Sequence, residues 1–266
     1  MPGFSAMQLS PRQFLFSCQL LIAGIACYGQ NENLSLQSHK AFITSLNTLG
    51  FTNSSVQRVD SIGETSESAR HFCKIYSKTM KTVAFQLQDM DSGSKIFIEK
   101  FEIGFADYFL RAWDDDKKNN LSPASEWKCF FSNPNAKPWQ IVLLGVNVHT
   151  NIDIWQTLVN NFSEKEIRLN KKLMLTMQSS VTKVYHQFFD TLMAQNGYLK
   201  FINTVTLGFA KKFGEQIIYK WRRRNVKLAI LYYQDKKRFA RRLAIVTRKK
   251  QMNDKQILSY KSTTTN

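Results

Sequence analysis

Residues 139–160, WQIVLLGVNVHTNIDIWQTLVN, form the stretch that decides the fold. The stretch contains no proline, and its apolar residues recur at steps of three and four, which predicts one long helix. Polar residues stand on two sides of this helix, among valine, isoleucine, leucine and tryptophan. A plain surface helix would carry its polar residues on one side only. We therefore expect this helix to lie inside a helical protein, with its polar groups buried and hydrogen-bonded.

The rest of the chain favours an all-helical fold. All five prolines lie at or before Pro138, and residues 139–266 contain only four glycines. Such a long proline-free stretch is typical of long helices. Ser163 and Glu166 form a capping box, which predicts a helix that runs to about residue 195. We predict an all-α, single-domain antiparallel bundle of about seven helices.

Composition and charge divide the chain into three parts. The 266 residues are 43% hydrophobic and 13% aromatic, which excludes disorder of the whole chain. We expect a signal peptide at residues 1–30 and a helical domain at 31–250, with basic helices from about residue 198. Residues 251–266 are expected to form a disordered tail.

The prediction of export depends on the first 30 residues. Residues 14–26, FLFSCQLLIAGIA, are apolar but shorter than the roughly 20 residues that span a membrane. This length fits the apolar region of a signal peptide, with cleavage after residue 29 or 30 and a start at Met1 or Met7. A buried helix or an uncleaved anchor is the alternative. Export would place the mature protein in the periplasm, in the envelope or outside the cell.

The cysteines do not define a disulfide framework, because the chain has only four. Cys73 and Cys129 remain after cleavage of the expected signal peptide. They could pair in an oxidising compartment or stay as buried free thiols, and the sequence leaves both alternatives open.

Positive charge is concentrated in the last quarter of the chain. The formal net charge is +17, and residues 199–266 hold 18 of the 37 Lys and Arg but only 3 of the 20 Asp and Glu. Apolar residues alternate with these basic clusters at helical spacing, a basic amphipathic pattern that suits an anionic membrane surface or envelope polymer. Interleaved aromatic residues would also suit single-stranded nucleic acid, which export disfavours. A core-packed helix with a solvated basic face is the alternative. The candidate binding residues are Arg222, Arg223, Arg224, Lys236, Lys237, Arg238, Arg241 and Arg242.

The candidate chemical site is the polar motif within residues 139–160. His149 and Asp153 are four residues apart and share a helix face, whereas Asn147 and Asn151 form a second pair roughly 200° away. Absence of a side chain at Gly145 leaves room for a ligand or a close helix.

A second histidine–aspartate pair repeats the four-residue spacing. His186 and Asp190, together with His149 and Asp153, would supply two imidazoles and two carboxylates. That set suits zinc or another divalent metal, whose bound water could act as a nucleophile. Asp107 and His71 are possible further ligands. The alternative is a structural hydrogen-bond network that fixes a buried imidazole.

The sequence resembles one family at three places. Residues 145–154, GVNVHTNIDI, resemble the Gly-Met-Asn-Ala-His-Ile-Asn-x-Asp-Leu signature of an uncharacterised bacterial domain-of-unknown-function family. Residues 101–113, FEIGFADYFLRAW, and residues 71–83, HFCKIYSKTMKTV, are similar to two further segments of that family. The resemblance covers roughly residues 68–225. It implies a helical domain in a bacterial protein and brings no established activity.

Two functions follow as hypotheses. The first is a metal-dependent hydrolase built on the histidine and aspartate residues. The second is a non-catalytic envelope protein that binds anionic lipid or polymer through its basic carboxyl-terminal helices. The residues name neither a reaction nor an oligomeric state.

Overall fold

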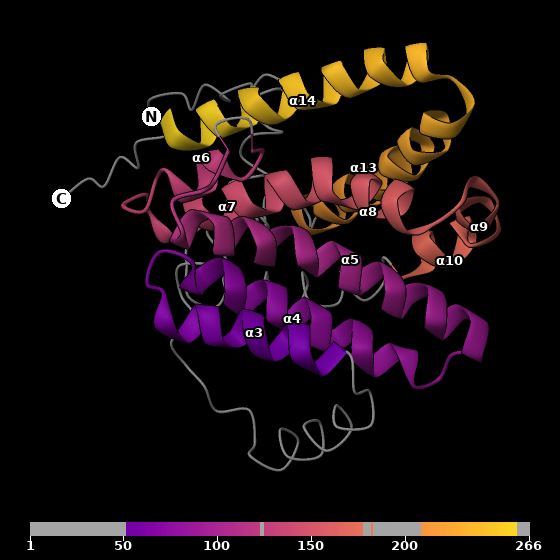
Figure 1. The fold of residues 1–266 in the computed structure, drawn as a ribbon, viewed down its shortest axis with the longest axis horizontal. Coiled ribbons are helices and arrows are strands. Elements are labelled where there is room, and N and C mark those ends of the chain that lie inside the picture. Colours follow the sequence, from indigo (N-terminus) through magenta and orange to yellow (C-terminus); the bar gives the residue numbers. More distant parts are fainter. Residues whose placement is uncertain (1–51, 123–124, 178–181, 183–208, 260–266) are drawn as a thin grey trace, which may run out of the picture.

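The computed structural model describes residues 52–122, 125–177, 182 and 209–259, and these residues contain helices and no strand. Figure 1 shows their arrangement. The all-α prediction is confirmed. The expected signal peptide and the pair His186 and Asp190 lie outside the described residues and stay predictions. The helices are α3 (Thr52–Thr65), α4 (Arg70–Leu87), α5 (Ser92–Lys117), α6 (Lys128–Phe131), α7 (Pro138–Val148), the π-helical turn η2 (His149–Asp153), α8 (Ile154–Asn161), α9 (Glu164–Leu169), α10 (Lys171–Thr176), α13 (Phe209–Gln234) and α14 (Lys236–Ser259).

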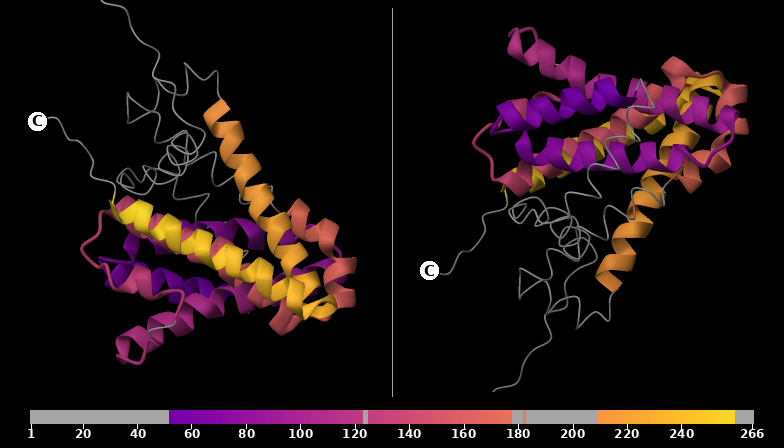
Figure 2. Two further views of the ribbon diagram at one scale, coloured as in Figure 1. Left: turned by 90° about the horizontal axis from the view of Figure 1, so that it is seen from above. Right: turned by 90° about the horizontal axis from the view of Figure 1, so that it is seen from below.

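The segment α7–η2–α8 forms the middle layer of the bundle. Helices α4 and α5 contact it on one side, while α13 and α14 contact it on the other. Figure 1 shows α14 along the opposite edge of the molecule from α3. Seen from above in Figure 2, α14 runs along the bundle, and α13 crosses it obliquely. No described helix is long and apolar enough to span a membrane.

Helix α3 is an element that the sequence analysis did not predict. Its sequence, TNSSVQRVDSIGET, is largely polar and has few apolar residues. Those few, Val56, Val59 and Ile62, recur every third residue and are buried. They contact the core because α3 packs against α4 and α5. A narrow apolar stripe of this kind is enough for a helix that covers only the edge of a core.

The predicted long helix at 139–160 exists, but it is not a continuous α-helix. A π turn at His149–Asp153 interrupts it. In a π turn each carbonyl accepts from the amide five residues later, so the helix widens locally. Side chains bond two carbonyls around this turn: the Asn151 amide donates to the Asn147 carbonyl, and the Asn225 amide donates to the Thr150 carbonyl. Polar side chains therefore stabilise the widened turn. The spacing of apolar residues in the sequence does not predict these hydrogen bonds.

Two other helix boundaries differ from the prediction. The capping box of Ser163 and Glu166 is present, but the helix that it starts ends at Leu169 rather than near residue 195. Asn170 interrupts it, because its side-chain amide donates to the Glu166 carbonyl and its backbone leaves the α-helical region. At the other end of the chain, α14 continues past position 250 to Ser259 and buries Ile257.

Gly145 provides the close approach between α7 and α4. A Cβ atom built at this position would lie 2.4–2.9 Å from ring atoms of Phe72, so the open space expected at Gly145 is filled by that ring.

Gly145→Ala should destabilise the protein by about 1–3 kcal/mol, because the buried ring must shift. Urea denaturation measures this loss. Gly93→Ala is the matched control: its Cβ would meet only Asp91 Oδ1 at 3.4 Å, so an unchanged or higher stability is expected there. Equal effects of the two substitutions would contradict this packing argument.

Candidate functional site

His149 and Asp153 form a buried pair across the π turn. His149 Nδ1 lies 2.6 Å from Asp153 Oδ2, and the two residues are only 5% and 1% exposed. A carboxylate bonded to one ring nitrogen fixes the orientation of an imidazole and directs its other nitrogen. The second nitrogen, His149 Nε2, is buried and has no hydrogen-bond partner among the described residues.

Aromatic rings from α4, α5 and the segment before α6 enclose the His149 imidazole. Phe105 stacks on it with a centroid distance of 4.0 Å, and Tyr76 meets it edge-on at 4.4 Å. Trp127 and Phe72 contact it at 5.4 and 5.7 Å. The Tyr76 hydroxyl and the Trp127 indole N–H are likewise buried and have no partner among the described residues. Burial, with the nearby Glu102 and Asp153, raises the pKa of Tyr76 well above its ordinary value, so its phenol is neutral.

The asparagine pair faces the opposite layer and attaches α14 to the middle helix. The Asn147 side-chain amide donates to the Lys250 carbonyl at 2.9 Å and to Asp254 Oδ1 at 2.8 Å. The Asn147 side-chain oxygen accepts from the amides of Asn151 and Asn253. We call the five residues Asn147, Asn151, Lys250, Asn253 and Asp254 the α14 anchor. Every polar atom of the Asn147 side chain is thus used in holding helices together.

Two charged residues of the α14 anchor neutralise each other inside the protein. Lys250 is only 3% exposed, and its Nζ lies 2.9 Å from Asp254 Oδ2 and 3.4 Å from Glu126 Oε2. Burial raises the pKa of Asp254, while Lys250 and the hydrogen bonds from Asn147 and Cys129 oppose that rise. A lysine buried this deeply requires such partners, since an unpaired buried charge is strongly destabilising.

Helix α13 joins the motif through Arg224 and Asn225. Arg224 donates to Asn151 Oδ1 at 2.6 Å, and Asn225 donates to the Thr150 carbonyl at 2.7 Å. Burial lowers the pKa of Arg224 to about 10. Arg224 was predicted as a surface-binding residue, but the structure turns it toward the motif.

Two further buried charged residues, which the sequence analysis did not identify, lie on α5 and α13. Glu102 and Arg222 are 7% and 8% exposed, and the Arg222 guanidinium donates to the Met174 carbonyl. Burial raises the pKa of Glu102 to about 7, and the Arg222 charge opposes the rise. Glu102 follows the buried Ile98 by four residues and precedes the buried Phe105 by three. That placement on an apolar face was the signal in the sequence.

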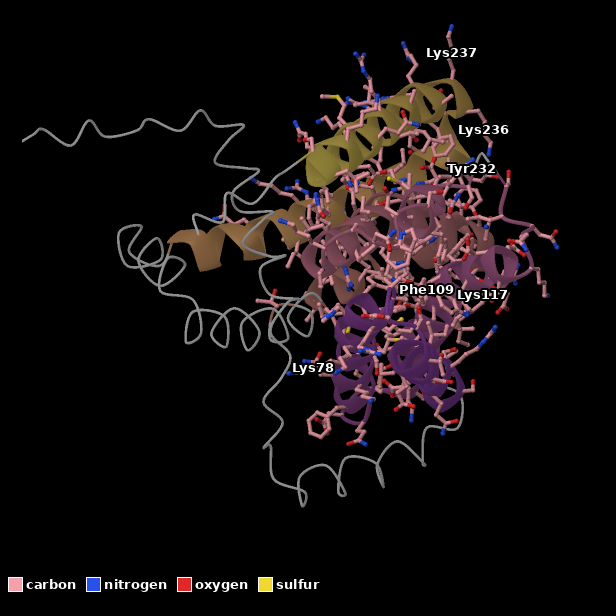
Figure 3. The ribbon with its side chains drawn as sticks, turned by 90° about the vertical axis from the view of Figure 1, so that its left-hand side faces the viewer. Lys78, Phe109, Lys117, Tyr232, Lys236 and Lys237 are labelled. Atoms are coloured by element: carbon pink, nitrogen blue, oxygen red, sulfur yellow. The ribbon has the colours of Figure 1, made fainter. Side chains whose placement is uncertain are left out.

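The other predicted binding residues divide between the inside and the outside of the protein. Arg222 is buried, so it cannot belong to a binding surface. Arg223, Lys236, Lys237, Arg238, Arg241 and Arg242 are exposed. Figure 3 shows Lys236 and Lys237 together near the start of α14. The exposed basic residues of α14 therefore share one outer face, separate from the α14 anchor on its inner face.

The proposed metal ligands are only partly described. No group of three or more histidine, cysteine, aspartate or glutamate side chains in the described part of the chain is arranged to hold a metal ion. Asp107 forms an exposed ion pair with Arg111, and its side chain is 41% exposed. His71 is half-buried. The described residues thus bring His149 and Asp153 together and leave Asp107 at the surface.

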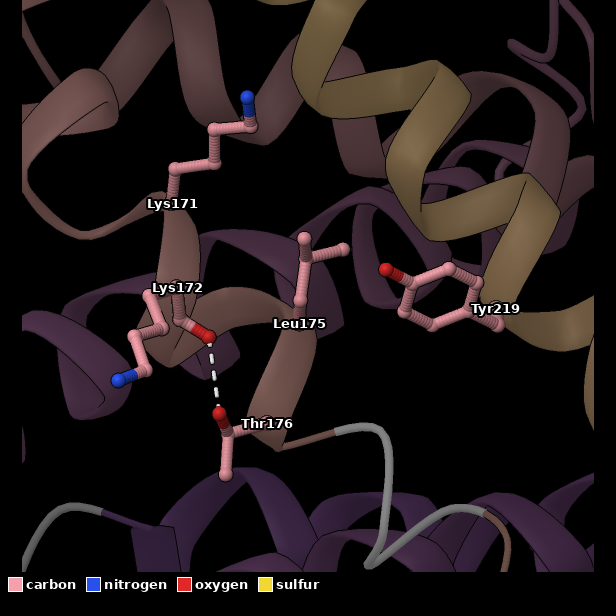
Figure 4. Close-up of a pocket in the computed structure, with 5 residues that line it drawn as sticks. All are labelled: Lys171, Lys172, Leu175, Thr176 and Tyr219. Atoms are coloured by element: carbon pink, nitrogen blue, oxygen red, sulfur yellow. Dashed lines mark hydrogen bonds between the residues drawn. The ribbon is translucent and has the colours of Figure 1, made fainter.

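One surface pocket of about 390 Å³ lies between α10 and α13 (Figure 4). Lys171, Lys172, Leu175, Thr176 and Tyr219 line it. None of these residues belongs to the polar motif, so this pocket gives no access to His149.

Comparison with known proteins identifies a family. The family model of DUF5995, a family of unknown function, matches residues 55–257. The chain belongs to the DUF5995 family. No curated protein and no solved structure matches it. In this DUF5995 member, the matched region contains the whole middle helix, the buried ion pair of Lys250 and Asp254, and nearly all of α14.

The structure of this DUF5995 protein distinguishes between the two alternatives for Cys73 and Cys129, a disulfide or two free thiols. Cys73 and Cys129 are free thiols and do not pair with each other. Cys73 is fully buried, and burial, reinforced by Asp60, raises its pKa far above the ordinary value. Burial also raises the pKa of Cys129 to about 11. Neither thiol is therefore activated as a nucleophile at neutral pH.

Glu102 makes the stability of the fold depend on pH. The folded state keeps the Glu102 proton up to about pH 7, whereas the unfolded chain releases it near the ordinary pKa of 4.5. Its contribution to stability is therefore complete below pH 4.5 and is lost as the pH rises to 7, by roughly 3 kcal/mol. Urea denaturation at pH 5 and at pH 7.5 measures how much the free energy of unfolding falls between the two pH values. This fall should be smaller for Glu102→Gln than for the wild type. Glu64→Gln, at an exposed position of α3, should behave like the wild type. An identical pH dependence in all three proteins would contradict the assignment.

Proposed function

We propose that this protein binds polyanionic surfaces through the outer face of α14. One observation carries the proposal: the exposed side of this helix is lined with basic residues, and none of them forms an ion pair with a described residue. These residues are Lys237, Arg238, Arg241, Arg242, Arg248, Lys249 and Lys255. A one-sided cluster of unpaired positive charge attracts anions from solution.

The inner face of α14 supports the proposal, because it fixes the basic face in place. Phe239, Val246 and Ile257 are buried against the bundle. Gln140 donates to the Ile257 carbonyl at 2.8 Å, and Asn147 donates to the Lys250 carbonyl. The basic face is therefore preformed, so binding does not pay for ordering a helix.

The expected strength of binding follows from the number of charges. A basic residue near an anionic surface contributes about 1 kcal/mol, and salt screens the attraction over about 8–10 Å at physiological ionic strength. Several residues acting together suffice for measurable binding. Binding should therefore weaken steeply as salt is added.

The charge test uses a double substitution on the outer face. Arg241→Gln with Arg242→Gln should elute from a heparin column at clearly lower salt than the wild type, because two exposed charges are lost. The matched control is Lys74→Gln with Lys78→Gln, which removes two exposed charges from α4. Figure 3 shows Lys78 on the far side of the molecule from Lys237. If both double variants eluted at the same salt concentration, total charge rather than this face would explain retention, and the proposal would be wrong.

A metal-dependent hydrolase is the second candidate, and the orphan nitrogen of His149 favours it. Metal-binding histidines commonly donate one ring N–H to a carboxylate and use the other nitrogen for the metal. Asp153 Oδ2 is already bonded to Nδ1. In this arrangement Asp153 is a positioning residue for Nε2, and the remaining ligands would come from His186 and Asp190.

Elemental analysis tests the second candidate directly. Protein purified without chelators should contain about one zinc or other divalent ion per chain if the metal hypothesis holds. His149→Gln and His186→Gln should each lower that content, and circular dichroism would show that both variants fold. Folded wild-type protein without stoichiometric metal would exclude this candidate.

A further inference from the structure

Two apolar side chains interrupt the basic outer face of α14. Ile245 is 48% exposed and Met252 is 50% exposed. They are seven residues apart, so they lie two turns apart on one side of the helix. Arg241 and Arg242 precede Ile245, and Arg248 and Lys249 lie between the two apolar residues. The outer face thus alternates charge with exposed aliphatic surface.

Resting on the proposed function, we infer that the polyanion is the surface of an anionic phospholipid bilayer, into which Ile245 and Met252 insert. Interfacial helices place an apolar stripe at the boundary between headgroups and acyl chains, while lysine and arginine contact the anionic headgroups. A soluble polyanion would engage the charges and leave both aliphatic side chains in water. Unlike a soluble polyanion, a bilayer uses the two features of this face together.

Three aromatic residues near the junction of α13 and α14 argue against a single-stranded nucleic acid. Binding of bases requires aromatic rings that are free to stack. Phe239 is buried and contacts Tyr232, whose ring also lies 3.2 Å below Lys236 Nζ. The Tyr233 hydroxyl donates to the carbonyls of Val159 and Phe162. These three residues are engaged in contacts within the protein, so their rings are not free to stack on bases.

The shape of the molecule suits contact along the whole helix. Helix α14 has 24 residues, which corresponds to a length of about 36 Å. It runs along one edge of the bundle, and no other described helix lies outside it in Figure 1. Its axis can therefore lie parallel to a membrane surface, with Lys237 at one end and Lys255 near the other.

Vesicle co-sedimentation tests the inference with the full chain. The two vesicle types are phosphatidylcholine alone and phosphatidylcholine with 30% phosphatidylglycerol. Ile245→Ser with Met252→Ser should lower partitioning onto the anionic vesicles roughly five- to tenfold and leave heparin elution unchanged. The matched control is Ile96→Ser with Leu169→Ser, which removes two exposed aliphatic side chains from other helices and should have no effect.

The design separates the face of α14 from other sources of membrane affinity. Every variant keeps residues 14–26, so any contribution from that apolar segment is common to all of them. All four positions are on the surface, and thermal unfolding checks that the variants are folded. Arg241→Gln with Arg242→Gln should weaken binding to both heparin and anionic vesicles.

Each outcome decides between the two proposals. Retention on heparin without binding to anionic vesicles would overturn the lipid inference and leave the proposed function standing. Absence of binding to both would remove the proposed function itself. Equal vesicle binding by the two serine double variants would overturn the insertion of Ile245 and Met252. Tighter binding to single-stranded DNA than to vesicles, unaffected by those two substitutions, would assign the face to nucleic acid instead.

Discussion

The structure depends on one constraint, which is that a helix whose central motif carries four polar residues is buried between two layers of helices. Each buried polar group needs a hydrogen-bond partner, because a buried donor or acceptor without one destabilises the fold by about 1–3 kcal/mol. The π turn at His149–Asp153 lets the motif form its hydrogen bonds on two sides at once, with His149 Nε2 as the exception. Asp153 bonds to the His149 ring on the aromatic side, while Asn147 and Asn151 bond to α14 and α13 on the other. The same four residues therefore contact both layers.

The hydrogen bonds between the motif and α14 explain why α14 can expose its basic side chains to solvent. A strongly basic helix repels itself and is a poor candidate for stable packing unless its inner face is fixed. Here Lys250 points inward and is neutralised by Asp254 and Glu126, and Asn147 bonds both to Asp254 and to the Lys250 backbone. The remaining basic residues point outward. The polar motif and the basic helix, which are about 100 residues apart in the sequence, are parts of one arrangement in which the motif orients the helix.

The sequence was enough to predict the helical fold and the burial of the motif, because spacing and composition carry both. It could not predict α3, whose three apolar residues are too few for a periodic signal. Nor could it separate the outer arginines from Arg222 and Arg224, since neighbours in sequence point to different sides of a helix and only the packing of α13 decides which side is inside. Glu102 was missed for a related reason: Arg222, the charge that acts on it, is 120 residues away, and a single acid in an apolar run resembles a surface interruption.

The sealed position of His149 bears on the two candidate functions. A histidine that acts on a substrate must be reached by it, and the ring of His149 is enclosed by Phe105, Tyr76, Trp127 and Phe72. Hydrolysis would require one of these rings to move or residues outside the described part of the chain to complete the site. The basic face of α14 requires no such change, because its charges already stand on the surface. The geometry therefore favours binding through α14, and the histidine–aspartate pair helps to keep the middle helix in place.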